Sequence, residues 1–281
     1  MSATCILTDS AAQFPQYGFS GKNDVHVVSY NIEINGQVYE EGKELKTFDL
    51  PASTRESFHP RLVVPSVEKF QELLTGLSAH YRDVIVIMTS SYLTAAFANT
   101  EKAANNVRGR VRVTLIDSQT TSIGLGLLVQ TAAEAVALGT PAMEIERMVR
   151  SMIPHIYMML CTPGMSYLYQ AGYLDQAQAF VGEMMGLMPI FTLEEGQLSA
   201  IEKVRNARGL LDFMQEFVLE FDQLQHIAFL QSTPPSAHEA RLMREHVQNY
   251  FPQTPFSELN FNLPLATLFG PRSVGLVAVE K

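Results

Sequence analysis

Hydroxyl and carboxylate side chains follow three strand-like apolar segments of this chain. Ser90-Ser91 comes directly after the apolar residues 84–88 and just before a helix-like stretch that starts at Thr94. Asp9-Ser10 and Asp117-Ser118 end two similar segments. Because ligands of parallel α/β sheets bind at the carboxyl ends of the strands, near free N–H groups of helix starts, these side chains predict an anion-binding edge. At any one junction, the alternative is that the side chain only caps the next helix.

The elements that must position these side chains alternate between strand and helix in the first half of the chain. Asn35-Gly36 between alternating residues predicts a hairpin, and Ser66 is expected to cap a helix. Strands are expected at residues 5–7, 27–28, 84–88 and 111–116, and helices at 65–74, 94–101 and 123–139, with another starting at Thr140-Pro141. This alternation predicts a mostly parallel sheet with helices on both faces.

The second half of the chain has a different pattern. A hairpin is expected from residues 188–193 and 197–201 around Glu194-Glu195-Gly196, followed by a helix over 206–221 and a strand over 226–230. Ser236 is expected to cap a helix that reaches residue 247, and strand-like segments cover 256–263 and 274–279. We therefore predict an α/β domain over residues 1–157 and an α+β domain with a mixed or antiparallel sheet over 158–281.

Composition and charge exclude several classes of protein. A length of 281 residues with 47% hydrophobic residues predicts a globular protein with substantial cores. The net charge of −9 argues against a nucleic-acid partner. The apolar residues 123–138 include Gln130 and Glu134, so a core helix is expected there and not an integral membrane protein. Cys5 and Cys161 lie among apolar residues, and the absence of a signal peptide favours a cytoplasmic protein with buried thiols.

Motifs for cofactors, metals and covalent catalysis do not occur. Gly124 and Gly126 follow a strand, but the third glycine of a dinucleotide loop is missing, so helix packing explains the pair better. No phosphate-binding Gly-Lys-Ser/Thr loop and no Gly-x-Ser-x-Gly elbow exists. His238 and His246 are too far apart for a two-histidine zinc motif. We expect no cofactor, no metal and no enzymatic activity.

Several segments, in order along nearly the whole chain, resemble the DegV family of fatty-acid-binding proteins. The segments that carry this resemblance are residues 6–12 with Pro15, 65–70, 90–94, 116–118, 122–126, 168–174, Pro189-Ile190 with Gly196, 203–205 and Gly270-Pro271. The resemblance implies a two-domain fold that holds one acyl chain between the domains. It also implies a non-catalytic carrier that presents the fatty acid to a separate kinase subunit.

The resemblance further implies which residues bind the head group. Ser91, the second serine of the pair, would hold the fatty-acid carboxylate. Ser90 and Ser10, at strand ends, are the further residues that we expect at the fatty-acid site. The family's threonine before the Pro-Ser helix start is Leu62 here, which offers no hydroxyl. Arg205 is the polar residue that remains among those associated with the kinase or the head group. Backbone N–H groups near Ser91, Ser10 or Arg205 could replace the missing threonine, or the ligand is not a free fatty acid.

Two further differences concern the kinase partner. Tyr173 stands where the family has an arginine, and Leu268 stands where it has a histidine. Both changes argue against acyl-phosphate formation with such a kinase.

We therefore expect a protein that binds a long-chain fatty acid or a similar lipid carboxylate in an apolar slot. The 13 methionines suit such an adaptable slot, although each could equally fill an ordinary core. At about 0.8 kcal/mol per buried CH₂, the acyl chain can dominate affinity. The alternative is an α/β enzyme that acts on a small phosphorylated or carboxylated metabolite at the same strand-end site.

Overall fold

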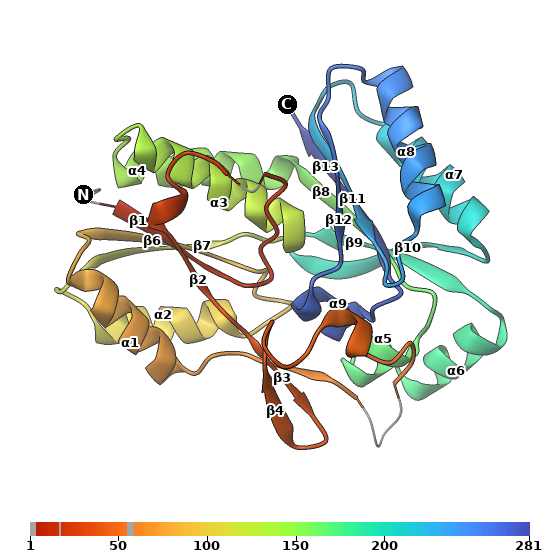
Figure 1. Cartoon of the computed structure of the whole chain (residues 1–281), viewed down its shortest axis with the longest axis horizontal. Coiled ribbons are helices and arrows are strands. Elements are labelled where there is room, and N and C mark those ends of the chain that lie inside the picture. The colour runs from red at the N-terminus through yellow and green to blue at the C-terminus, as the bar shows by residue number, and fades with distance from the viewer. Residues whose placement is uncertain (1–3, 17, 55–58) are drawn as a thin grey trace. The chain divides into compact units, whose positions relative to one another are not determined.

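The chain folds into two compact units. The structure, a computed structural model, describes residues 4–16, 18–54 and 59–281. The first unit contains residues 1–30, 64–155 and 194–197, and the second contains 31–63, 156–193 and 198–281. The first unit contains one sheet and the second contains two, and Figure 1 labels their strands and helices.

The first unit is built on a four-stranded parallel sheet in the order β2-β1-β6-β7. Its strands are β1 (Thr4–Asp9), β2 (Val25–Val28), β6 (Asp83–Met88) and β7 (Arg112–Asp117). Every residue of the two central strands is buried, because helices cover both faces of the sheet. The parallel sheet that the alternating pattern predicted is confirmed.

Helices α1 and α2 lie on one face of this sheet, and α3 and α4 lie on the other (Figure 1). Their bounds are α1 (Val67–Ser78), α2 (Ala96–Asn106), α3 (Ser122–Ala137) and α4 (Ala142–Met152). Ser66 caps α1 as predicted, since its hydroxyl accepts the Lys69 N–H. Thr140 does not cap α4, because Pro141 occupies the N-cap position. Helix α3 is a core helix, as expected, and no helix in the described ranges is long and apolar enough to cross a membrane.

The second unit contains a six-stranded mixed sheet in the order β10-β9-β8-β13-β11-β12. Its strands are β8 (Ile156–Cys161), β9 (Met188–Glu194), β10 (Gln197–Val204), β11 (Leu224–Gln231), β12 (Phe256–Asn260) and β13 (Val274–Glu280). Its helices are α5 (Ser166–Gln170), α6 (Gln176–Met184), α7 (Ala207–Val218), α8 (Ala237–Tyr250) and α9 (Leu263–Phe269). Helices α7 and α8 pack on the sheet around Phe229, Met214 and Met243. The predicted mixed sheet is confirmed.

The methionines divide between core and surface. Met159 is fully buried in the core of the second unit, which is the ordinary core role. Met158 and Met165 are buried as well, whereas Met184 and Met185 are exposed on and just after α6.

Residues 31–63 belong to the second unit, although the sequence placed them in a domain covering residues 1–157. They contain β3 (Asn31–Ile34), β4 (Gln37–Glu40) and β5 (Arg61–Val63), which form a small antiparallel sheet in the order β4-β3-β5. The Tyr167 hydroxyl donates to the Pro51 carbonyl at 2.8 Å, and the Thr47 hydroxyl donates to the Phe261 carbonyl at 3.3 Å. These long-range contacts, which local sequence does not encode, tie the segment to the second unit.

The end of the chain differs from the expected pattern. The segment 256–263 was expected to be strand-like throughout, but β12 ends at Asn260 and α9 begins at Leu263. The Asn262 side chain caps α9 by accepting the Leu265 N–H at 3.1 Å, and Pro264 occupies the first turn. Ser236 sits at the N-cap of α8, but its hydroxyl makes no capping bond.

Candidate functional site

The carboxyl ends of β1, β6 and β7 meet at one edge of the parallel sheet, where buried Asp9 is the central anchor. One Asp9 carboxylate oxygen accepts the Thr89 N–H at 2.7 Å. The other accepts the Thr89 hydroxyl at 2.9 Å and the Ala11 N–H at 3.0 Å. Burial raises the pKa of Asp9, and these donors, together with the Tyr30 hydroxyl, partly oppose that rise. Asp9 therefore holds the segment after β6 in place.

Ser90 is fully buried, and its hydroxyl is engaged inside the protein. It donates to the Gly196 carbonyl at 2.7 Å and accepts the Tyr92 N–H at 3.3 Å. The Ser90 N–H donates to the Thr120 carbonyl at 2.9 Å. Ser90 was predicted to bind the fatty acid. In the structure, its hydroxyl bonds to two backbone groups of the protein and so anchors the segment.

Ser91 is exposed, and it differs from Ser90 in every contact. Its N–H points at the Asp117 carboxylate, with distances of 3.2 and 3.4 Å to the two oxygens. Asp117 also accepts the Gln119 N–H at 3.1 Å. The Ser91 hydroxyl makes no hydrogen bond within the described residues. We therefore take this hydroxyl as the candidate ligand donor of the segment.

Backbone N–H groups at this edge are already used. The Ser10 N–H donates to the Val28 carbonyl at 3.0 Å, and the Ser10 hydroxyl accepts the Tyr30 N–H at 3.0 Å. The Ser91 N–H is directed at Asp117. The expected substitution of these amides for the missing threonine therefore does not apply at Ser10 or Ser91.

The other two predicted residues lie in the second unit. Leu62 is the central residue of β5 and pairs with Ile32 of β3, with its side chain partly buried. Arg205 follows β10, is exposed, and makes no ion pair within the described residues. The structure thus brings Ser10, Ser90 and Ser91 together in the first unit, and it places Leu62 and Arg205 in the second.

Sequence reasoning did not assign roles to the residues that hold Ser90 and Ser91. Asp9 and Asp117 were noted only as strand-end signals, and Gly196 only as part of a hairpin. Glu195 and Gly196 both have positive φ angles, 49° and 86°, as a tight two-residue hairpin turn requires. The Glu-Glu-Gly sequence signals that turn, but it does not show which residue the turn contacts.

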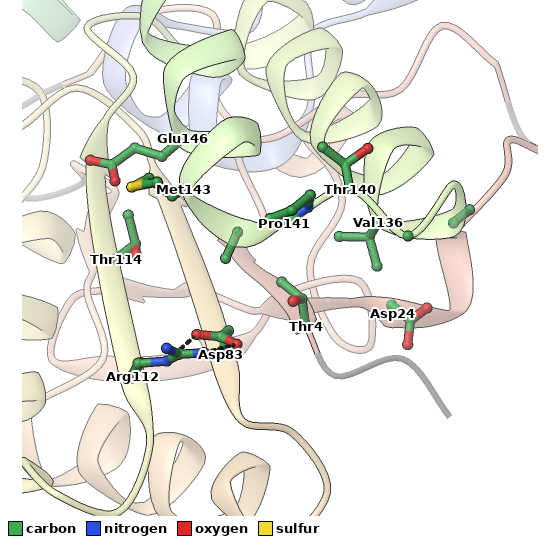
Figure 2. A pocket seen from close by; sticks show the side chains of 13 residues that line it. Thr4, Asp24, Asp83, Arg112, Thr114, Val136, Thr140, Pro141, Met143 and Glu146 are labelled. Carbon is green, nitrogen blue, oxygen red and sulfur yellow. Dashed lines mark hydrogen bonds and ion pairs between the residues drawn. The ribbon is translucent and has the colours of Figure 1, made fainter.

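A hollow of about 950 Å³ lies at the opposite, amino end of the same strands. Figure 2 shows Thr4, Asp83 and Arg112, which begin β1, β6 and β7, beneath the start of α4. Arg112 and Asp83 form a double ion pair, Nε to Oδ1 at 2.6 Å and Nη2 to Oδ2 at 2.8 Å. Because the two charges satisfy each other and ligands of such sheets bind at the carboxyl ends, we place the candidate site at Ser91.

Other chemistry is not evident in the described ranges. No group of three histidine, cysteine, aspartate or glutamate side chains there could hold a metal ion. Cys5 and Cys161 are free and buried, as expected, and burial raises the pKa of each thiol to about 12.

Comparison with known proteins gives matches along the whole chain. A family model described as an uncharacterised protein of the DegV family matches residues 3–281. A DegV domain-containing protein of Caldanaerobacter subterraneus is 30% identical over 233 residues, which is 79% of this chain and 80% of that protein.

Solved structures share the fold. The crystal structure of DegV from Bacillus subtilis, described as a fatty acid binding protein, matches with a TM-score of 0.84 at 20% identity over all of both chains. The Fatty Acid Kinase (Fak) B3 protein of Streptococcus pneumoniae, loaded with linoleic acid, matches with a TM-score of 0.82 at 15% identity over all of both chains.

Proposed function

Since this chain belongs to the DegV family, we propose that it binds a long-chain fatty acid, or a similar lipid carboxylate, as a non-catalytic carrier. The observation that carries the proposal is the exposed Ser91 hydroxyl, which makes no hydrogen bond to the described part of the chain, while the residues before it are anchored. The fatty-acid binding described for the Bacillus subtilis relative supports it. The two buried, unpaired cysteines fit a reducing cytoplasm as the place of action.

The exposure of Ser91 explains how a carboxylate can bind without the missing threonine. A fully buried carboxylate needs about two or three hydrogen bonds to stay ionised. A carboxylate beside an exposed serine keeps part of its hydration, so water supplies the remaining donors. Affinity then depends chiefly on the acyl chain, at about 0.8 kcal/mol per buried CH₂.

The alternative of an enzyme acting on a phosphorylated metabolite is less well supported. A phosphate at Ser91 would bring about two negative charges close to the Asp117 carboxylate, whereas a fatty-acid carboxylate brings one, so the phosphate is repelled more strongly. Within the described residues, neither Asp9 nor Asp117 forms an ion pair with a lysine or arginine that could offset this repulsion.

Native mass spectrometry of the protein purified from a bacterial host tests the proposal directly. We expect an added mass equal to one long-chain fatty acid, because a buried acyl chain dissociates slowly. The control is the same sample after organic extraction, in which the acid should appear in the extract and the added mass should disappear. Purified protein without bound lipid that also fails to bind added fatty acid would contradict the proposal.

The similarity to the Fak B3 protein suggests a fatty-acid kinase subunit as a partner. The side chains near the expected phosphoryl group argue that this chain supports little acyl-phosphate formation with such a kinase. Tyr173 stacks against Phe269 with ring centroids 6.4 Å apart, and burial raises its pKa, so it serves as packing and supplies no cation. Leu268 supplies no titratable donor. Transfer of a phosphoryl group is stabilised mainly by positioned cations and donors.

We therefore predict little or no acyl-phosphate when the lipid-loaded protein is incubated with a bacterial fatty-acid kinase and ATP. The pneumococcal Fak B3 protein under the same conditions is the positive control. Turnover comparable to that control would show that Arg205 and the remaining donors suffice, and would contradict this prediction.

A further inference from the structure

The turn between β9 and β10 lies against the serine pair, although it is far away in the sequence. The Gly196 carbonyl accepts the Ser90 hydroxyl at 2.7 Å, across 106 positions of the chain. Residues 194–197 belong to the first compact unit, while the strands on either side of the turn belong mostly to the second. Within this hairpin, the turn therefore belongs to the same unit as Ser90 and Ser91.

Glycine is required at position 196 for two separate reasons. Its φ angle of 86° lies in the left-handed region that side chains rarely adopt. A Cβ atom there would also lie 2.6 Å from the Ser90 hydroxyl oxygen and 3.1 Å from the Gln119 Cα. The second reason is specific to this site, because the crowding atoms belong to the segments that present Ser91.

We propose that the turn Glu194–Gln197 positions the head-group serine, with Gly196 and Ser90 as the positioning residues. The Gly196 carbonyl fixes the Ser90 hydroxyl, and Ser91, the next residue, then presents its own hydroxyl to the lipid carboxylate. This inference rests on the proposed fatty-acid function. It assigns Ser90 to positioning and Ser91 to ligand contact.

Gly196→Ala tests the role of the turn, and Gly36→Ala is its matched control. Gly36 also follows a residue with positive φ in a two-residue hairpin loop, and its own φ of 79° is similar, but a Cβ there meets nothing within 4 Å. We expect Gly196→Ala to weaken fatty-acid binding about fivefold or more and Gly36→Ala by less than about twofold. Displacement of a dansylated undecanoic acid measures both affinities.

The methyl ester of the same fatty acid separates positioning from general loss of structure. A charged carboxylate gains more from the Ser91 hydroxyl than an ester does, so misplacing that hydroxyl should lower the preference for the acid over the ester. Gly196→Ala should therefore lose this preference, and Gly36→Ala should keep it. An equal loss of affinity for acid and ester in Gly196→Ala would overturn the proposal.

A double-mutant cycle gives a second test at the other end of the contact. Ser90→Ala removes the hydroxyl that Gly196 accepts, so it should also reduce the preference for the acid. The loss of affinity in the double variant should then be smaller than the sum of the two single losses, because Ser90→Ala removes the oxygen that the new Cβ at position 196 would crowd. Additive effects in the double variant would overturn the proposed coupling.

Failure of this inference and failure of the proposed function give different results. A wild-type protein that binds neither the dansylated acid nor a natural fatty acid would overturn the proposed function. A wild-type protein that binds both, with Gly196→Ala and Ser90→Ala unchanged in affinity and in preference for the acid, would overturn only the positioning role.

Discussion

Asp9→Asn is expected to lower the free energy of unfolding by about 3 kcal/mol. Asp9 is fully buried, and its two oxygens accept the Thr89 N–H, the Thr89 hydroxyl and the Ala11 N–H. An asparagine of the same shape turns one acceptor into an NH₂ group that faces a donor, leaving buried groups unpaired. Urea denaturation followed by circular dichroism measures the change.

Asp49→Asn is the control for this experiment. The Asp49 carboxylate also accepts a backbone N–H, that of Lys46 at 2.8 Å, but it is exposed. Water can replace the lost contact there, so the expected cost is below about 1 kcal/mol. Equal effects of the two substitutions would show that Asp9 does not anchor the strand-end segment.

The pH dependence of the Asp9 effect has a definite sign. Burial raises the folded-state pKa of Asp9 above its ordinary value of 3.8. The folded protein then keeps a proton that the unfolded chain has lost, so the stability contributed by Asp9 falls as pH rises from the ordinary pKa through the raised one. Asparagine does not titrate. The stability lost in Asp9→Asn should therefore be larger at about pH 4.5 than at about pH 8.

Ser91→Ala is expected to weaken fatty-acid binding more than tenfold. The substitution removes a hydrogen bond from a hydroxyl to a charged carboxylate, which contributes about 1.5–3 kcal/mol. Because the Ser91 hydroxyl has no partner within the described residues, its loss should leave the thermal midpoint nearly unchanged. The same fluorescent displacement assay gives the affinity.

Ser151→Ala provides the matched control for Ser91→Ala. Ser151 is an exposed serine on α4, and its hydroxyl donates to the Met148 carbonyl within its own helix. The Ser151→Ala variant should bind fatty acid with the affinity of the wild type. If Ser91→Ala also binds as the wild type does, the head group lies elsewhere and the assignment of Ser91 is wrong.

Local chemistry determined the elements that carry the candidate site. Alternating strand and helix patterns predicted the parallel sheet, since central strands buried on both faces must be apolar along their length. Ser66 capped its helix, and Asn35-Gly36 formed its hairpin, because each depends on contacts within a few residues. The strand ends bearing Asp9, Ser90 and Asp117 then had to meet at one edge.

Tertiary structure decided what each side chain at that edge does. The sequence offered Ser90 and Ser91 as a pair, yet one hydroxyl is buried against Gly196 and the other is exposed. The Ser91 N–H meets Asp117, 26 positions away, because β6 and β7 pair in a particular register. Such long-range partners depend on packing and strand register, and no local pattern specifies them.

Long-range contacts also decide where the two compact units divide along the chain. Residues 31–63 follow the first strands in the chain, but side-chain contacts such as Tyr167 to Pro51 place them in the second unit. Sequence order predicts neighbours along the chain. Hydrogen bonds and packing between distant segments decide which core a segment joins, and so which residues can share a site with Ser91.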